Sequence, residues 1–276
     1  MPSLCEFDTR SVHPPANPRP DTRAIVNFPR PFTARPRVSH GFRSLDIDKN
    51  SNIRANSIIQ SYTKNWADCH ITTWAGTTLY SGVDQLFVLA PNDLDFLTGE
   101  HMRDLLDDPT DPPSVRIDFE RPFVTPPKVV VFLNYIDLDK NRNWSIKTTA
   151  DDVDVGGFTL TIETWGDAIL YTAQACWVAY PEEREHIFST SVNTTDVRPQ
   201  YIPQQEQNAE IAFDGVEFWK TPSVFIALNS FDIDCEANLR IDAFVHDVSE
   251  AGLVWHIDSW GDTVLYSAGA SIIAFN

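Results

Sequence analysis

Basic residues are scarce in this chain of 276 residues. Lys and Arg number 21 against 39 Asp and Glu, which gives a formal net charge of -18. Nucleic-acid backbones and anionic membranes attract clustered Lys and Arg. We therefore expect no nucleic-acid partner and no docking on anionic lipid, and the charge suits a neutral or cationic ligand.

Long apolar runs are also missing. No stretch of eighteen apolar residues could span a bilayer, so we expect no membrane insertion. The opening MPSLCEFDTRSVHPPANPRP lacks a basic start followed by seven or more apolar residues, so it does not read as a secretory signal. These features predict a cytoplasmic protein, which could still act after release or ingestion.

Cysteine is rare and irregularly placed. Cys5, Cys69, Cys176 and Cys235 form no C-x-x-C pair, and no cysteine recurs at the same distance from a repeated tryptophan. A disulfide framework in a repeat protein would be expected to recur. We predict four free thiols in a reducing compartment.

Catalytic signatures are absent as well. The chain contains no G-x-S-x-G, H-E-x-x-H, phosphate-binding loop or paired C-x-x-C motif. A hydrolase built on two converging carboxylates stays the third alternative, because a sequence cannot show convergence. The prediction is no catalysis, no metal and no cofactor.

A short phrase occurs three times, as TWAGTTLYS, TWGDAILYT and SWGDTVLYS. An Asp lies twenty-eight residues before each Trp, at Asp46, Asp137 and Asp232, and a Phe-x-x-x-Pro-x-Val stretch comes earlier still. Three spacings held in register define internal repeats. We place three units at residues 1–91, 92–184 and 185–276.

Each unit reads as β-strands. PKVVVFLNYIDL, FTLTIETW and AILYTAQACWVAY are rich in Val, Ile, Thr and aromatics, and no window shows a capped helical period. We predict an all-β protein in which each unit folds as its own antiparallel β-sandwich. Val38, Val129 and Val224 should then be buried at equivalent places.

The acidic stretches SLDIDKNSN, YIDLDKNRN and SFDIDCEAN resemble the start of a calcium-binding EF-hand loop. A glycine at the sixth position and a glutamate at the twelfth are both missing, and the flanks are strands. These stretches are predicted to be polar turns.

The repeated Trp has two interpretations. It is either a core residue or an outward plate for the apolar face of a sugar, with the Tyr six residues later adding a second ring and a hydroxyl. The Ile three residues before it points to the opposite side of the strand, which favours the outward position. Arg54 and Arg240, each twenty residues before a Trp, are either surface residues paired with the preceding Asp or donors to ligand hydroxyls.

The ordered set of Phe-x-x-x-Pro-x-Val, Asp, Asn-x-Arg, Trp and Tyr resembles the H-type lectin domain of snail agglutinins and slime-mould discoidins. The resemblance implies a six-stranded antiparallel β-sandwich that assembles as a trimer. It also implies galactose or N-acetylgalactosamine binding at the contact between neighbours. Three tandem units could form such a trimer-like arrangement within one chain.

By position, the resemblance makes the sugar-contacting residues Arg54, Trp74, Tyr80, Trp165, Tyr171, Arg240, Trp260 and Tyr266. The middle unit departs from it, with Ser145 in place of Arg and Lys147 two residues later. The His that follows the Trp in snail lectins is here Ala75, Gly166 or Gly261, which opens the pocket. The family's Asp from a neighbouring unit has Asp21, Asp108 and Asp111 as candidates.

The expected function is thus a multivalent, metal-independent lectin whose partners are galactose- or N-acetylgalactosamine-containing glycans, with homo-oligomers adding further valency. The alternative is a structural or protein-interaction scaffold that kept the sandwich and lost sugar binding. The departures at Ser145 and Ala75 favour that alternative.

Overall fold

The computed structural model describes residues 2–276, which form eighteen strands and two short 3-10 turns, η1 (Thr9–Ser11) and η2 (Thr194–Asp196). The strands of the first unit are β1 (Ser3–Asp8), β2 (Asp21–Asn27), β3 (Arg37–Ile47), β4 (Ile53–Tyr62), β5 (Trp66–Thr72) and β6 (Leu79–Leu89). Those of the second are β7 (Leu97–Asp104), β8 (Ser114–Asp118), β9 (Lys128–Leu138), β10 (Trp144–Asp154), β11 (Gly157–Glu163) and β12 (Leu170–Tyr180). Those of the third are β13 (Ile187–Asn193), β14 (Asn208–Ala212), β15 (Ser223–Ile233), β16 (Leu239–His246), β17 (Gly252–Asp258) and β18 (Leu265–Phe275).

Within a unit the six strands form two halves of three. In the first unit the halves are β1-β6-β3 and β2-β5-β4, and both contribute to one buried apolar cluster. All pairings are antiparallel. Alternate residues point inward, as in β5, where Ala67, Cys69 and Ile71 are buried. The all-β fold with three six-stranded sandwich units is confirmed.

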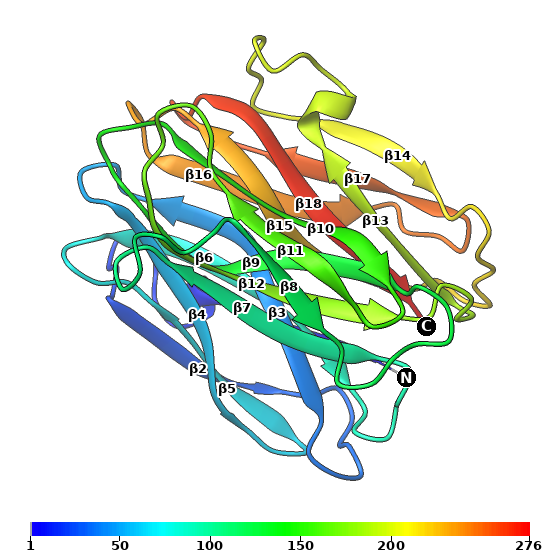
Figure 1. The fold of residues 1–276 in the computed structure, drawn as a ribbon. Coiled ribbons are helices and arrows are strands. Elements are labelled where there is room, and N and C mark those ends of the chain that lie inside the picture. The colour runs from blue at the N-terminus through cyan, green and yellow to red at the C-terminus, as the bar shows by residue number, and fades with distance from the viewer. Residues whose placement is uncertain (1) are drawn as a thin grey trace.

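The sequence led us to expect three independent sandwiches, and this prediction is wrong. Every sheet continues from one unit into another (Figure 1). The three six-stranded sheets have the orders β1-β6-β3-β16-β17-β14, β2-β5-β4-β9-β12-β7 and β13-β18-β15-β10-β11-β8. We call the three contacts the 1–2 junction (β4 with β9), the 2–3 junction (β10 with β15) and the 3–1 junction (β16 with β3). The three units thus close a ring, and each uses two different edges to do so.

A second apolar cluster lies where the three units meet, separate from the sandwich interiors. Three equivalent positions on β3, β9 and β15 hold residues of very different size, namely Gly41, Phe132 and Ala227. A Cβ on Gly41 would lie 2.6 Å from Cδ2 of Phe132 and 3.1 Å from Cβ of Ala227. One unit therefore supplies an aromatic ring where the other two leave space. The ring of Phe132 also packs at 4.8 Å, centroid to centroid, on Phe225.

Side chains from the last strand of a unit bond the backbone of another unit near this centre. Gln85 on β6 accepts a hydrogen bond from the backbone N–H of Ile226, at 2.8 Å. Ser271 on β18 donates to the carbonyl of Val131, at 2.7 Å. Because these contacts use different residue types, they fix the order of the units around the ring.

The three valines expected at equivalent places do occupy equivalent places. Each pairs with the last strand of its own unit, and Val224 is buried while Val38 and Val129 are half-buried against the core. No helix in the described residues has the length and apolarity needed to cross a membrane.

All four cysteines are free thiols, and Cys5, Cys69 and Cys176 are buried. Burial raises the pKa of Cys5 to about 11 and raises the pKa values of Cys69 and Cys176 further. Only Cys235 is partly exposed.

Gly41→Ala should destabilise the protein by about 1–3 kcal/mol, because the added methyl overpacks the centre against Phe132. In a Phe132→Leu background the same change should cost less, since the shorter side chain leaves room. Urea unfolding of the four proteins of the double-mutant cycle measures the coupling. Val124→Ala, at a fully exposed position, is the control. Strictly additive effects would show that Gly41 is not needed for this packing.

Thiol titration should find four groups in the denatured protein without reductant. In the folded protein Cys235 should react first, because the thiolate is the reactive form and burial suppresses it at the other three. A titration that finds two groups or none after denaturation would contradict the assignment of free thiols.

Candidate functional site at the junctions between units

Each junction is held by four residue pairs, of which the second and the fourth are polar. The second pair contains the Asp that recurs in each unit. Arg54 lies opposite Asp137 in the 1–2 junction, Arg240 opposite Asp46 in the 3–1 junction, and Ser145 opposite Asp232 in the 2–3 junction. Directly opposed residues of an antiparallel pair share one face of the sheet. Three equivalent sites therefore form between units, with the Arg position and the Asp supplied by different units.

In the 1–2 junction, Nε of Arg54 lies 3.1 Å from one carboxylate oxygen of Asp137 and donates to the other at 3.2 Å. Asp137 is buried, and this burial raises the pKa of its carboxyl despite the opposing effect of Arg54. Among the described residues, neither Nη group of Arg54 has a hydrogen-bond partner. The guanidinium, whose side chain is 16% exposed, keeps two donor groups for a ligand.

In the 3–1 junction the equivalent guanidinium, that of Arg240, makes more hydrogen bonds within the protein. Nε of Arg240 lies 3.6 Å from Asp46, while its Nη1 donates to Asp262 and, at 3.3 Å, to Thr263 Oγ1. Asp262 lies two residues after the repeated Trp of its unit, at the position where unit one has Gly76. Burial again raises the pKa of the junction carboxyl, here that of Asp46.

In the 2–3 junction the missing Arg is replaced by neutral donors. Trp165 Nε1 donates to Asp232 at 3.0 Å, and Gln200 Nε2 donates to the same oxygen at 2.7 Å. Ser145 does not reach Asp232; its hydroxyl donates to the backbone carbonyl of Trp165 at 2.8 Å. Lys147 is exposed and pairs in register with Ser230. Asp232 is therefore already bonded within the protein.

The repeated Trp sits at the first position of a tight turn at the rim of each junction. Trp165 and Trp260 are each 37% exposed, and Trp74 is half-buried, so none is a core residue. The residue after each Trp has a left-handed backbone, with φ of 49° at Ala75, 66° at Gly166 and 67° at Gly261. Glycine adopts this conformation freely, which explains two of the three departures from His.

Each repeated Tyr lies near the junction that its own unit forms with the unit before it in the ring. The charges of Asp137 and Arg54 act on the pKa of Tyr171, and those of Asp46 and Arg240 act on the pKa of Tyr80. A Trp and Tyr six residues apart in sequence therefore belong to different junctions.

The Tyr hydroxyls are not free donors, contrary to the interpretation from sequence. They donate to the second Asp of the acidic stretches, at 3.0 Å from Tyr80 to Asp48 and 2.8 Å in the other two units. The same Asp accepts the backbone N–H two residues later, as Asp48 does from Asn50 at 2.7 Å. The acidic stretches are thus polar turns, as predicted.

The 1–2 junction carries two further residues that sequence reasoning missed. The ring of Tyr135 lies 5.2 Å from that of Trp74, centroid to centroid, and burial raises its pKa to about 12. The charge of Asp104 at the end of β7 acts on both Tyr135 and Asp137. Neither residue recurs in the other units, so the repeat gave no signal for them.

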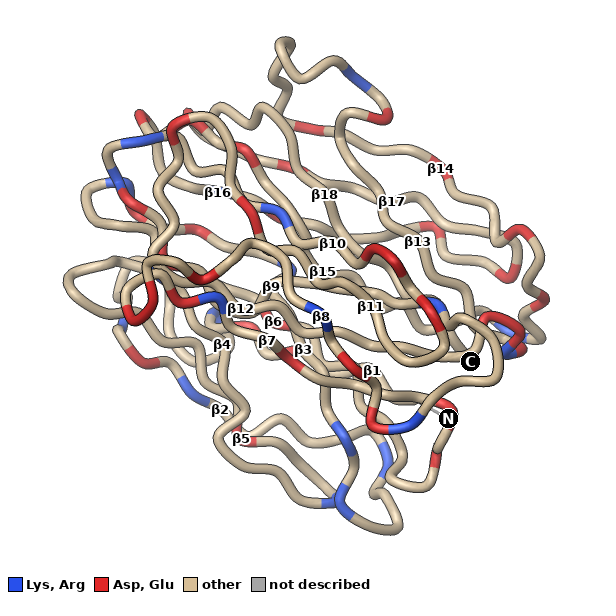
Figure 2. Tube along the Cα trace, in the orientation of Figure 1, with Lys and Arg blue, Asp and Glu red and all other residues tan. Residues whose placement is uncertain are grey.

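The three acidic residues that the sequence offered as the neighbouring unit's Asp each have a partner within their own unit. Asp21 pairs with His70, Asp108 accepts from Thr110, and Asp111 accepts the backbone N–H of Asp104. In the described chain, no group of three or more His, Cys, Asp or Glu side chains is placed to hold a metal ion. Lys and Arg positions are scattered among more numerous Asp and Glu positions (Figure 2).

Comparison with known families identifies the family of the three units. The model of the H-type lectin domain matches residues 23–82, 114–180 and 208–275, once in each unit and over more than half of the chain. The chain belongs to the H-type lectin family.

Two individual proteins are similar to this H-type lectin chain. The "ATP synthase subunits region ORF 7" protein of Fuscovulum blasticum is 32% identical over 76 residues, which is 27% of this chain and 66% of that protein, just under two thirds of its length. The structure of discoidin II of Dictyostelium discoideum covers 65% of this chain and 96% of its own, at 12% identity and a TM-score of 0.28. The family match supports a carbohydrate-binding lectin.

The Asp232 carboxyl should make stability depend on pH. Burial raises its pKa in the folded protein, so the folded chain binds this proton more tightly than the unfolded chain. Its stabilising contribution is present below the ordinary Asp pKa of about 3.9 and is lost as pH rises through the folded pKa. Relative to Asp232→Asn, the parent should therefore lose free energy of unfolding between pH 4 and 7.

Urea unfolding of both proteins across that range measures the difference. Parallel profiles, or a parent that gains stability relative to the variant as pH rises, would show that the carboxyl is not held at a raised pKa.

Proposed function

We propose that this H-type lectin chain binds galactose- and N-acetylgalactosamine-type glycans at its junctions, multivalently and without catalysis. The observation that carries the proposal is the 1–2 junction, where Arg54 presents two uncommitted Nη groups beside the buried carboxylate of Asp137 and the neighbouring, tilted rings of Trp74 and Tyr135. A guanidinium and a carboxylate provide donors and acceptors for neighbouring hydroxyls. An aromatic face suits the C–H face of a pyranose.

The three junctions differ in what they can offer. The 1–2 junction has a free guanidinium fork, the 3–1 junction has one in which Asp262 and Thr263 occupy Nη1, and the 2–3 junction has none. The expected order of affinity is Arg54 site, then Arg240 site, with the 2–3 junction weakest. Two linked weak sites still gain avidity on a surface that displays many sugars.

A structural role is favoured for the 2–3 junction alone. There Trp165 and Gln200 both donate to one oxygen of Asp232, and Ser145 stands where the other two junctions have a guanidinium. The scaffold alternative thus has support in one junction out of three.

Assembly and location are part of the proposal. Because one chain closes all three junctions, each site is complete without a second copy, and homo-oligomers would only multiply the sites. Three buried free thiols suit a reducing compartment such as the cytoplasm. A glycan array at high sugar density is the experiment that separates a lectin from a scaffold.

Arg54→Ala and Arg240→Ala together should abolish binding to a galactosylated surface. A hydrogen bond from a charged group contributes about 1.5–3 kcal/mol when buried and less when partly exposed, so each loss should weaken a site by roughly tenfold or more. Trp74→Ala and Trp260→Ala should act in the same direction if stacking forms the other half of recognition.

Isothermal titration with galactose and with N-acetylgalactosamine can count the sites. Lys147→Ala, an exposed change in the junction that lacks Arg, is the matched control and should change little. Three equal sites, or full binding by the double Arg variant, would rule out Arg as the discriminating group.

A further inference from the structure

The 1–2 and 2–3 junctions each open into a groove beyond their four paired residues. In the 1–2 junction β4 pairs with β9 only over Ile53–Asn56, and the rest of β4 turns away to pair with β5 alone. The groove so formed has a volume of about 520 Å³ and is lined by β3, β4, β7, β9 and β12. Ligand pockets span about 300–1,000 Å³, so the groove is large enough to bind a small molecule.

A β-bulge places one side chain over each groove. The bulged residue lies at the same position of β3, β9 and β15, and it is Arg43, Asn134 and Asn229 in the three units. A bulge leaves the extra residue outside the regular ladder and redirects its side chain. These three side chains decide whether each groove is filled.

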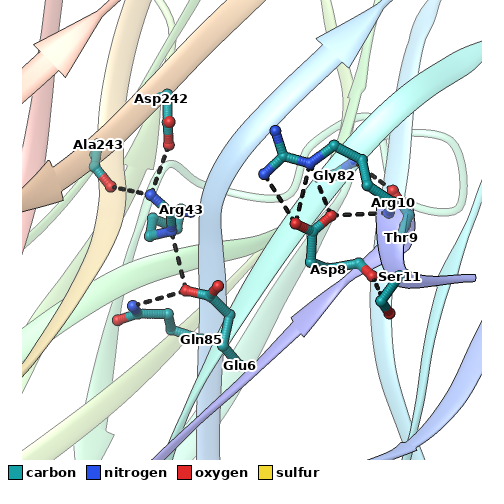
Figure 3. A network of polar contacts seen from close by, with 10 residues as sticks. All are labelled: Glu6, Asp8, Thr9, Arg10, Ser11, Arg43, Gly82, Gln85, Asp242 and Ala243. Carbon is teal, nitrogen blue, oxygen red and sulfur yellow. Dashed lines mark hydrogen bonds and ion pairs between the residues drawn. The ribbon is translucent and has the colours of Figure 1, made fainter. Parts of the chain in front are cut away.

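In the 3–1 junction the corresponding space holds the side chain of Arg43, whose polar contacts Figure 3 shows. Its Nη1 donates to Asp242 at 2.9 Å and to the carbonyl of Ala243 at 3.4 Å, and its Nε lies 3.2 Å from Glu6. Gln85 donates to the same Glu6 carboxylate at 3.1 Å.

In the 2–3 junction the bulged residue is an amide that is already bonded. Asn229 Nδ2 donates to Ser191 Oγ at 2.7 Å and to Ser271 Oγ at 2.9 Å. The groove there is smaller, at about 330 Å³.

The 1–2 groove differs from both because its amides are uncommitted. Asn134 is 2% exposed, and its buried Oδ1 has no hydrogen-bond partner within residues 2–276. The half-buried side-chain amides of Asn56 and Gln174, which also line the groove, likewise have no hydrogen-bond partner in the described chain. The equivalent positions hold Asp242 and Val83 in the 3–1 junction, and Lys147 and Gly269 in the 2–3 junction. A buried unpaired amide is costly unless something binds it.

We propose that the 1–2 groove holds the sugar residues that follow the terminal one, so that the Arg54 site selects an oligosaccharide over a monosaccharide. This inference rests on the proposed function of that site. Asn56, which lines the groove, and Arg54 share one face of β4 two residues apart, roughly 7 Å along the strand, so the groove begins about one sugar residue from the site.

The lining identifies the chemistry of the ligand. Amides, the hydroxyls of Thr98 and Ser57, and the side chains of Tyr62 and Ile58 surround the space. Glu100 and His40 also line it, the latter bonded to Asp84, and no Lys or Arg does. Amides and hydroxyls donate to and accept from neutral hydroxyl groups. Because the Glu100 carboxylate repels anions and neither Lys nor Arg offsets it, the groove does not favour sulfated or phosphorylated glycans, and a neutral oligosaccharide fits best.

The test uses the full chain carrying Arg240→Ala, which leaves the Arg54 site as the one Arg site. Titration with galactose and with a neutral galactose-terminated tetrasaccharide gives two dissociation constants. The tetrasaccharide should bind about tenfold more tightly, a difference of about 1.4 kcal/mol. Adding Asn134→Arg with Asn56→Asp recreates the Arg43–Asp242 pair in this groove. That change should return the ratio to about one and leave the galactose constant unchanged.

Two controls keep the result interpretable. Gln174→Ala, a milder change, should lower the ratio severalfold without burying a new charge. Arg54→Ala in the otherwise unchanged chain leaves the Arg240 site, where Arg43 occupies the corresponding space, so its ratio should be about one.

The outcomes separate the two claims. If the Arg54 site binds galactose and the tetrasaccharide with equal affinity, the groove inference is wrong and the proposed function still stands. The groove inference is also wrong if the variant with Asn134→Arg and Asn56→Asp still binds the tetrasaccharide about tenfold more tightly than galactose. No galactose binding at either Arg site would defeat the proposed function and the groove inference with it.

Discussion

The pairing of four residues across each junction is the constraint on which the rest of the molecule depends. A half-sheet of three strands leaves a long edge with unpaired backbone groups, and such an edge must be covered. Here β3, β9 and β15 each pair along that edge with the β4-type strand of another unit. Since three units satisfy three edges, the ring closes and no further copy is needed.

The same pairing creates the three candidate sites and explains why they differ from one another. Register brings an Asp from one unit opposite the Arg position of another, so each site needs two units to exist. A change on either side alters one junction and leaves the others intact. In separate identical subunits every site would be the same, whereas a single chain can hold Arg54, Ser145 and Arg240 in three different states.

The repeat, the strand content and the family could be predicted from the sequence because their signals recur in all three units, and a recurring signal is stronger than a single one. The Asp46, Asp137 and Asp232 series was visible in the sequence, but its partners were not, since strand pairing between units leaves no mark on spacing. Tyr135 and Asp104 could not be found because neither recurs.

The exchange of Tyr between junctions escaped detection for the same reason. Residues six apart in sequence lie near each other along the chain, and nothing in the spacing indicates that the following strand carries the Tyr to another junction. The left-handed backbone after each Trp is the opposite case. Gly166 and Gly261 signalled it, and Ala75 shows that the turn persists where glycine is absent.

The centre of the ring shows why the three units are no longer interchangeable. Gly41, Phe132 and Ala227 fill one space with one ring and two small groups, a solution open only to a chain whose copies differ. Protein interiors are packed so densely that a change in side-chain volume there alters the stability of the fold. Because the centre differs from unit to unit, each unit fits its own position, and the bulge residues Arg43, Asn134 and Asn229 face neighbours that also differ. Specialisation of the junctions then follows from the packing that orders the units.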